Sequence, residues 1–354
     1  MLRSGFQIFL VCLAIGAILC QGCNGQSYTA DGLWTIPDRI PVLCVAPNGG
    51  LLAFAEQRAA ASDSGYINAS LRRSMDNGTN WTPLQVVGGD GSNTYSCGAV
   101  VVDQTNGTVF FFVGRSLAGD TEAMIDAGTS VDTKRIYLYS STDSGTNWSG
   151  PTDLSASVKK AGWNFCDPGP GTGIQLSTGR LIVPWYYSIG TNYYSTVMYS
   201  DDHGSTWSSS YGATNNPATH SENNVVALTN GSLMMIARND DFAMTNTTVS
   251  ISTSTDSGVT WSGMTNSPTL SYVGGCVSFV RYTSSPSRLL FCNAASGNLA
   301  DGNARSNLTV RVSYDEGNSW SVSKTYYPGL SNYSALTILS FLSRIWSRCI
   351  CRVA

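Results

Sequence analysis

Short apolar runs alternate with clusters of Gly, Asn, Pro and Ser along most of the chain. Such runs, bounded by turn residues, are typical of buried β-strands. Five strand–turn–strand pairs are the clearest, with strands expected at 42–46 and 51–56, 100–103 and 109–113, 173–176 and 180–185, 225–228 and 232–238, and 279–282 and 288–292. Only the stretch 117–133 could hold a short helix. The pattern predicts an all-β protein.

An eight-residue phrase follows each of these pairs. It has the form Ser-x-Asp-x-Gly-x-x-Trp and occurs at 74–81, 141–148, 200–207, 254–261 and 313–320. Gly supplies a turn that needs a positive φ, the Asp carboxylate folds back onto backbone N–H groups, and Trp packs under the turn. Each phrase should join two further strands, which makes four strands per repeat, as in a propeller blade. We therefore expect five blades and a sixth closed by the two chain ends, with residues around 34–41 supplying one strand.

Composition supports this prediction and narrows the choice of partner. Charged residues make up 12% of the chain, which suits many short strands joined by polar turns better than helices laced with ion pairs. The net charge of −3 and the pI of about 5.3 argue against nucleic acid or an anionic membrane as the main partner. No domain boundary is visible within 27–340, so we expect one propeller domain there.

The N-terminus carries the pattern of a secretory signal peptide. Residues 1–26 contain Arg3, an apolar run at 8–19, and then small and polar residues. A membrane-spanning helix needs about 20 apolar residues, and the run at 8–19 is shorter, which favours a signal peptide. An uncleaved N-terminal anchor is the alternative. We expect a secreted or lysosomal protein with no obligatory membrane partner. Nine Asn-x-Ser/Thr sequons fit that expectation, although a chain rich in these residues forms some by chance: Asn68, Asn77, Asn80, Asn106, Asn147, Asn230, Asn246, Asn307 and Asn332.

The cysteines and histidines do not suggest a metal site. Cys12, Cys20 and Cys23 lie in or beside the predicted signal peptide, and no Cys-x-x-Cys spacing occurs among the other cysteines. His203 and His220 are the only histidines. We expect no metal and no cofactor. Cys276 and Cys292 flank an expected hairpin turn, so they could form a disulfide; two buried free thiols are the alternative.

Several charged residues stand at strand ends, where a site could form. Glu56 and Arg58 lie on one side of an expected strand, and Asp63 follows in a loop. Other candidates are Arg39 before the first strand, Glu222 before a strand pair that ends at Arg238, Arg305 after a polar loop, and Tyr333 in a turn. Taken singly, each of these residues is more often structural, as when an arginine snorkels at a strand start.

Taken together and in this order, these residues resemble the exo-α-sialidase (neuraminidase) family. The shared phrases are Arg39-Ile-Pro41, Phe54-Ala-Glu-Gln-Arg58 with Asp63, Gly169-Pro-Gly-x-Gly173, and Leu181-Ile-Val-Pro184. The resemblance runs from about residue 31 to 339 and implies a six-bladed β-propeller. It also implies a retaining hydrolase of terminal α-linked sialic acid that passes through a sialyl–tyrosine intermediate.

The resemblance assigns roles by position. Arg39, Arg238 and Arg305 match an arginine triad that binds the sialic acid carboxylate, which is a task suited to planar, always charged guanidinium groups. Glu56 matches the carboxylate that orients Arg39, and Asp63 matches the general acid/base. Tyr333 matches the nucleophile and Glu222 its base. Sialidases with a tyrosine nucleophile are an exception to the two-carboxylate rule, and a neutral phenol avoids repulsion from the carboxylate on the anomeric carbon.

Three further residues match family positions near the sugar. Arg58 is expected to bind substrate, with a structural salt bridge as the alternative. Tyr186 and Tyr187 fall where the family keeps aromatic pocket residues, with core packing as the alternative. The implied partners are sialylated glycans of glycoproteins, gangliosides and oligosaccharides.

The resemblance ends soon after Tyr333. Residues 341–354 are basic, contain two cysteines and show no turn signal, so the last blade is expected to be incomplete and Tyr333 less firmly held against Glu222. This leaves alternatives open: a trans-sialidase, an inactive sialic-acid-binding homologue, and a non-enzymatic propeller that binds protein partners.

Overall fold

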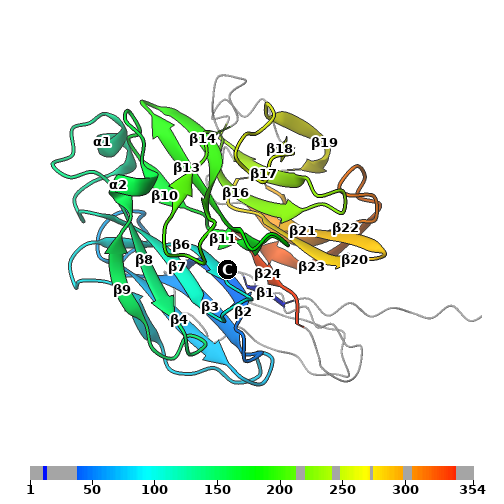
Figure 1. Ribbon diagram of the computed structural model, residues 1–354, viewed down its shortest axis with the longest axis horizontal. Helices are drawn as coiled ribbons and strands as arrows, with labels where there is room; N and C mark the ends of the chain where they lie inside the picture. The colour runs from blue at the N-terminus through cyan, green and yellow to red at the C-terminus, as the bar shows by residue number, and fades with distance from the viewer. Residues whose placement is uncertain are drawn as a thin grey trace, which may run out of the picture.

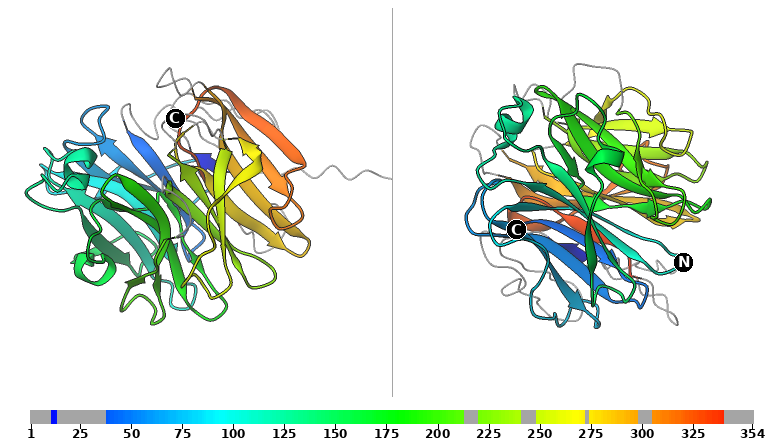
Figure 2. Two further views of the ribbon diagram at one scale, coloured as in Figure 1. Left: turned by 90° about the horizontal axis from the view of Figure 1, so that it is seen from above. Right: turned by 60° about the vertical axis from the view of Figure 1, so that its left-hand side comes forward.

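The computed structural model describes residues 11–13, 38–212, 220–240, 248–271, 274–297 and 305–339. Their sheets follow one another around a common centre, and the colours run from blue through green and yellow to orange around that centre (Figures 1 and 2). The fold is a six-bladed β-propeller in which the sixth blade is incomplete among the described residues. The all-β prediction is confirmed.

Five blades have an antiparallel core of consecutive strands. The first two blades contain β2 (Arg39–Val45), β3 (Leu51–Arg58), β4 (Ile67–Ser74) and β5 (Gln85–Gly88), then β6 (Thr94–Val102), β7 (Val109–Ser116), β8 (Arg135–Ser141) and β9 (Ser149–Asp153). The fourth and fifth contain β16 (His220–Ala227), β17 (Leu233–Asn239), β18 (Thr248–Ser254) and β19 (Thr265–Ser271), then β20 (Ser278–Ser284), β21 (Ser287–Ser296), β22 (Ser306–Ser313) and β23 (Val322–Leu330). Each expected strand pair in these blades is present, and most strands are longer than predicted, although β2, β6 and β16 each end one residue early.

The third blade departs from the prediction at its innermost strand. Its outer strands are β13 (Leu181–Ile189), β14 (Asn192–Ser200) and β15 (Ser208–Ser209). A continuous strand was expected at 173–176, but the inner edge is divided into β10 (Cys166–Pro168), β11 (Gly171–Thr172) and β12 (Ile174–Gln175). Pro168 and Pro170 donate no backbone hydrogen bond, and Gly169 has a φ of 62°, so a regular ladder cannot run through them. β11 pairs instead with β6 of the second blade.

The sixth blade is represented by β24 (Ala335–Thr337), which pairs with β1 (Val11–Leu13). The prediction that residues 34–41 close this blade is wrong for 39–41, which begin β2 and pair with β3 of the first blade. Residues 34–37 lie outside the described part, as do most of the predicted signal peptide and the tail at 341–354. The three residues of β1 fall within the predicted signal peptide.

The five repeated phrases form the turns between the third and fourth strands of the five blades. In the first, Asp76 Oδ1 accepts a hydrogen bond from Asn80 N at 2.8 Å, and Ser74 Oγ accepts one from Gly78 N at 2.8 Å. Gly78 has a φ of 86°, and the residue before it, Asn77, also has a positive φ of 59°. The predicted roles of Gly and Asp are confirmed. The second left-handed position was not predicted, because Asn, Ser, His and Glu all occupy it.

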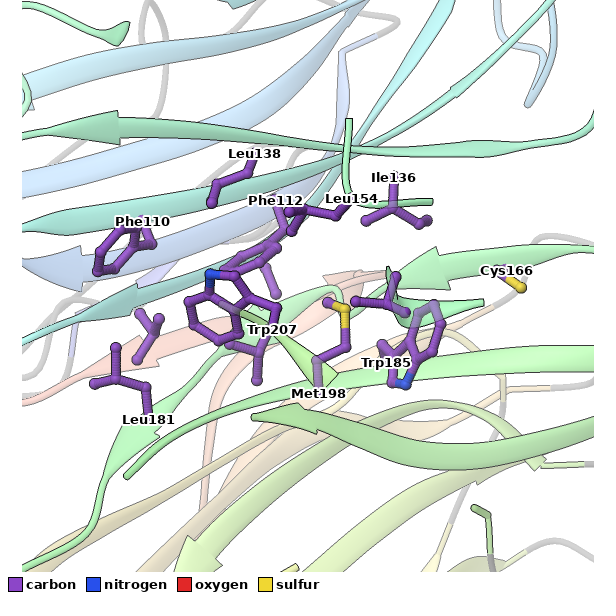
Figure 3. Close-up of a cluster of buried hydrophobic side chains, with 14 of the residues drawn as sticks. Phe110, Phe112, Ile136, Leu138, Leu154, Cys166, Leu181, Trp185, Met198 and Trp207 are labelled. Carbon is purple, nitrogen blue, oxygen red and sulfur yellow. The ribbon is translucent and has the colours of Figure 1, made fainter. Parts of the chain in front are cut away.

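The tryptophan of each phrase does more than support its own turn, because it packs between blades. Trp207 Nε1 donates to Gly204 O at 3.1 Å, while its ring meets Phe112 of the second blade edge-on, with centroids 4.8 Å apart. Figure 3 shows this cluster of side chains from two adjacent blades. Trp148, Trp261 and Trp320 join the corresponding clusters. Trp81 of the first blade packs in a cluster with Ala335 and Leu339, which links it to the last described segment.

Helices contribute little. The short helix expected within 117–133 is α1 (Glu122–Asp126), where the Thr121 side chain accepts a hydrogen bond from Met124 N at 3.3 Å. A second, unpredicted helix is α2 (Ser155–Val158). Within the described ranges, no helix is long and apolar enough to cross a membrane.

The proposed Cys276–Cys292 disulfide is wrong. The hairpin exists, but its register sets Cys292 opposite Ser278, so Cys276 lies before β20 begins. Cys276 and Cys292 are both buried and are not joined to each other, and Cys44 and Cys166 are buried as well. For Cys276 and Cys292 the alternative of two buried thiols therefore holds.

Candidate active site

A cavity of about 750 Å³ opens at one end of the strands. It is lined by residues from several blades, including Arg58, Asp63, Glu222, Arg238 and Tyr333. β3 runs away from the turn at 47–50 and ends at Arg58, whereas β4 returns and ends at the first repeated phrase. The repeated phrases and the cavity therefore lie at opposite ends of the blades, and the repeats are scaffold.

Tyr333, Glu222 and Arg238 form a connected group in the cavity. The Tyr333 hydroxyl donates to Glu222 Oε1 at 2.7 Å, and Arg238 Nη1 lies 3.1 Å from Glu222 Oε2 and 3.3 Å from the Tyr333 oxygen. Glu222 stands where the β16–β17 register shifts between His220 and Asn223. Such a bulge turns a side chain out of the regular alternation. The incomplete sixth blade was expected to hold Tyr333 less firmly against Glu222. The hydrogen bond between them is nevertheless present.

The phenol of Tyr333 is held in its neutral form. Burial raises its pKa most, and the neighbouring Glu222 carboxylate raises it further. Arg238 and Arg39 act in the opposite direction, but the net result is a pKa well above the usual value. A tyrosine in this environment can attack an electrophile only if a base removes its proton, and Glu222 is in hydrogen-bonding contact with that proton.

The other two predicted arginines also lie beside Tyr333. The Arg39 guanidinium carbon is 5.6 Å from the centre of the Tyr333 ring, and Arg39 Nη1 is 3.4 Å from Asp63 Oδ1. Arg305 Nη1 donates to Asn332 Oδ1. A Cβ on Gly275 would be 2.8 Å from Arg305 Nη1 and 3.6 Å from Tyr333 Cε2, so both side chains flank this glycine. The structure thus brings all three arginines around Tyr333.

Glu56, Arg58 and Asp63 form a chain along one wall. Arg58 Nε donates to Glu56 Oε2 at 2.7 Å, and Arg58 Nη1 donates to Asp63 Oδ1 at 2.8 Å. Glu56 and Arg58 are almost fully buried, whereas the Asp63 side chain is 78% exposed. Glu56 lies opposite Arg39 in the strand register, but its carboxylate binds Arg58, so its predicted role of orienting Arg39 stays a prediction. Arg58 therefore makes the structural salt bridge that was its alternative reading, and it also lines the cavity.

The environment of Asp63 favours its ionised form. Desolvation acts to raise its pKa, but the Arg58 and Arg39 guanidinium groups outweigh that effect, and the net pKa is lowered. The positive charges of Arg58 and Arg39 also favour the binding of an anion near Asp63. A ligand carboxylate placed on Arg39 would offset part of that arginine's effect on Asp63.

The two candidate tyrosines of β13 point in opposite directions, as neighbours in a strand do. Tyr186 lines the cavity. Tyr187 packs in the core between blades two and three, where its ring is stacked on Trp163 with centroids 3.6 Å apart. Its hydroxyl accepts a hydrogen bond from Gly212 N at 3.3 Å. The structure supports a ligand contact for Tyr186, and it places Tyr187 in the packing role that was the alternative.

Several cavity residues were missed. Asp240 Oδ1 lies 2.6 Å from Arg238 Nε, and its position two residues after Arg238 could have suggested it. The Tyr193 hydroxyl donates at 2.5 Å to Oδ2 of Asp126, the last residue of α1. Lys134 and Asp167 form a buried pair with an N–O distance of 2.6 Å. No sequence pattern marks Lys134, because a single lysine after a polar loop is ordinarily solvated.

These observations define a β-propeller with a cavity in which three arginines surround a tyrosine–glutamate pair and an aspartate stands on the wall. A family model described as a BNR repeat-like domain matches residues 41–340. A sialidase from Micromonospora viridifaciens is 32% identical over 336 residues, covering 89% of this chain and 50% of that protein. A sialidase from Paraclostridium sordellii is 31% identical over 300 residues, covering 78% and 71% respectively. The chain belongs to the exo-α-sialidase family with BNR repeats, and it spans about half the length of the Micromonospora relative.

Solved structures of related proteins show the same fold. The Hadza microbial sialidase Hz136 superposes with a TM-score of 0.75 at 23% identity, covering 89% of this chain and 64% of that one. A leech intramolecular trans-sialidase, complexed with 2,7-anhydro-Neu5Ac, superposes with a TM-score of 0.70 at 20% identity, covering 85% and 63%. At these identities the likeness concerns the fold alone.

Proposed function

We propose that this protein is an exo-α-sialidase that removes terminal α-linked sialic acid from glycans with retention of configuration. The observation that carries the proposal is the 2.7 Å hydrogen bond from the Tyr333 hydroxyl to Glu222, made beside Arg238 and facing a wall that ends in Asp63. A nucleophile paired with its base, beside positive charge and across from an acid, is the minimum that a retaining glycosidase needs.

The arginines account for the choice of an acidic sugar. Arg39, Arg238 and Arg305 converge around Tyr333, and several cations this close stabilise a bound carboxylate. In sialic acid the carboxylate is attached to the anomeric carbon. A carboxylate held by the arginines therefore sets the anomeric carbon near the Tyr333 hydroxyl, and a neutral sugar would leave the arginines uncompensated.

In the first step the Tyr333 oxygen attacks the anomeric carbon. Glu222 takes the phenolic proton as the C–O bond to Tyr333 forms. Protonated Asp63 gives its proton to the departing glycosidic oxygen as the bond to the aglycone breaks. The products are a sialyl–tyrosine, protonated Glu222, ionised Asp63 and the free aglycone.

In the second step a water molecule replaces the aglycone. Ionised Asp63 takes one proton from the water as its oxygen bonds to the anomeric carbon, and the bond to Tyr333 breaks. The Tyr333 oxygen recovers its proton from Glu222. Two inversions give net retention, and every group returns to its starting protonation state.

The proposed substrates are sialylated glycoproteins, gangliosides and oligosaccharides, met in the secretory pathway, in lysosomes or outside the cell. This location is supported by the signal-like pattern of residues 1–26 and by the sequons. N-terminal sequencing of protein from the medium of secreting cells tests it. That measurement also shows whether the residues of β1 remain in the mature chain.

The activity is tested by release of a fluorophore from an aryl α-sialoside, with Tyr333→Phe as the informative variant. Wild type should release sialic acid, and Tyr333→Phe should lose at least about 100-fold in kcat while still binding sialic acid. Tyr187→Phe is the matched control, because it removes a tyrosine hydroxyl that faces the core. A folded wild-type chain that binds sialic acid but releases none would refute the proposal in favour of a binding protein.

A further inference from the structure

The cavity contains a second polar group that the proposed reaction does not use. Lys134 Nζ lies 2.6 Å from Asp167 Oδ2, and Ser96 Oγ lies 2.8 Å from Asp167 Oδ1. All three residues line the cavity and are at least nine-tenths buried: Lys134 is 4% exposed, and Asp167 and Ser96 are each 8% exposed. Burying an ion pair carries a desolvation penalty that a surface pair does not have, so a buried pair is weak evidence for stability alone and suggests another role.

This group is connected to the reacting residues through one strand. Asp167 of β10 lies directly opposite Tyr186 of β13 in the sheet register, and Tyr186 lines the same cavity. Burial raises the pKa of Tyr186 most, and Asp167, Glu222 and Tyr333 all contribute to the shift. Tyr186 thus adjoins Asp167 in the sheet, and both residues line the same cavity as Glu222 and Tyr333.

The backbone makes room for the pair. A Cβ on Gly114 would be 2.0 Å from Asp167 Oδ1 and 2.6 Å from both Lys134 Cε and Ser96 Oγ. No other residue could occupy position 114 while the three side chains keep their places. The β6–β7 register also shifts just after Ser96, between Cys97 and Ala99. The part of the cavity wall formed by Ser96, Lys134 and Asp167, called here its floor, therefore depends on a glycine at position 114.

The hydrogen-bonding capacity of the floor exceeds what the three residues use among themselves. An ammonium group has three N–H donors, and Asp167 takes one of those of Lys134. The Lys134 nitrogen also lies 4.3 Å from the centre of the Phe165 ring. This cation–π contact stabilises the positive charge but does not replace a conventional hydrogen bond. A ligand hydroxyl can accept from Lys134 and donate to Asp167, whereas a methyl group can do neither and would cover both charges.

We propose that Lys134 and Asp167, with Ser96, form a subsite for a ring substituent that ends in a hydroxyl group. The inference rests on the proposed sialidase function and adds a preference to it. In this proposal the carboxylate lies on the arginines, the anomeric carbon lies at Tyr333, and the acylamino group of the ring extends to Lys134 and Asp167, which line the same cavity as Tyr333. The site then favours a sialic acid that carries a hydroxyacetamido group over one that carries an acetamido group, and the two sugars differ only by that hydroxyl.

The test compares two aryl α-sialosides that differ only in this substituent. Wild type should show a kcat/KM at least roughly tenfold higher for the hydroxyacetamido sugar, because its competitor leaves buried polar groups unsatisfied. The affinities of the two free sugars, measured by calorimetry, should show the same order. A ratio near one in both measurements overturns the proposal, and neither measurement depends on a variant that folds.

A double variant assigns the preference to the pair. Lys134→Met with Asp167→Leu removes both charges together, so no lone charge is left buried, and it should bring the ratio to about one or below. Arg281→Met with Glu316→Leu is the matched control at the opposite end of the strands, where the ion pair has an N–O distance of 2.6 Å, and it should leave the ratio unchanged. A folded double variant that keeps the wild-type ratio overturns the proposal. Release of either sugar upholds the sialidase function, whatever the ratio. If both sugars bind and neither is released, the sialidase function is refuted. The affinities of the two free sugars then still decide the preference.

Discussion

The Tyr333 hydroxyl donates a hydrogen bond to Glu222 Oε1 at 2.7 Å, although the two residues are 111 positions apart. Glu222 comes from the fourth blade, and Tyr333 from the segment that leads to β24. The pKa of this phenol is strongly raised, so the proposed reaction needs a base in contact with its proton, and Glu222 is in that position.

Replacing Glu222 with glutamine should remove the base and keep the fold. The amide can still accept the phenolic hydrogen bond, but it cannot take the proton, so kcat should fall by about 100-fold or more. The value of KM should change much less, because the arginines remain. Steady-state kinetics with an aryl sialoside measure both quantities. Equal losses in kcat for this variant and the double variant Glu222→Gln/Tyr333→Phe would show that the two residues act as a unit, and additive losses would contradict it.

Replacing Asp63 with asparagine should matter most for poor leaving groups. An alkoxide aglycone needs a proton as it departs, whereas a nitrophenolate does not, so the loss in kcat should be at least about tenfold larger for a sialyl-lactose than for a nitrophenyl sialoside. Similar losses for both substrates would show that Asp63 is not the acid.

The same variant isolates the pH dependence of the acid. The pKa of Asp63 is lowered, so the acid loses its proton below the ordinary range of an aspartate, and the protonated form becomes steadily scarcer as pH rises from there. The ratio of kcat/KM between wild type and Asp63→Asn should therefore fall as pH increases from 4 to 7, by up to roughly tenfold per unit. A ratio that rises or stays constant over that range would contradict the role.

The Glu56–Arg58 pair should be important for stability. Both side chains are at most 4% exposed, so Glu56→Gln leaves a guanidinium buried without its main counter-charge. We expect a loss of about 3 kcal/mol in the free energy of unfolding, measured with denaturant. The control is Asp201→Asn in the Arg180–Asp201 pair, whose aspartate is 57% exposed, and it should cost about 1 kcal/mol or less. Equal losses would mean that the burial of Glu56 is unimportant.

The aspartates of the repeated phrases should govern resistance to acid. Hydrogen bonds from Thr206 lower the pKa of Asp202 to about 2, so the ionised form is preferred in the folded state. Its contribution to stability is fully present above the pKa of the unfolded chain, near 4, and is lost as pH falls through 2. Thermal unfolding should show wild type more stable than Asp202→Asn at pH 7, with the two curves converging by about pH 2. A gap that stays constant with pH would assign the stabilisation to geometry alone.

The repeated phrases were readable in the sequence because their physics is local. Asp76, for example, binds backbone and side-chain groups within four residues of itself, so eight residues suffice to define the turn. The same holds for the alternation of strand and turn that predicted the blades. The identities of Arg39, Glu56, Asp63, Glu222, Arg238, Arg305 and Tyr333 were also recoverable, because they keep the order of a known family.

What surrounds those residues was not readable, because it depends on contacts between distant strands. Tyr187 looked equivalent to Tyr186, and only the pleat of β13 sends one to the cavity and the other to the core. Cys276 and Cys292 looked paired, but the hairpin register set Ser278 opposite Cys292.

The sequence by itself determined the repeat, the strand pattern and the proposed chemistry, since each depends on residues that are close together or stand in a fixed order. The tertiary structure decided which charges meet. It joined Lys134 to Asp167 across the second and third blades, and it placed Trp81 against Ala335 and Leu339 between the first blade and the last segment. Such contacts follow from closing a ring of sheets, which brings together positions whose spacing along the chain carries no signal.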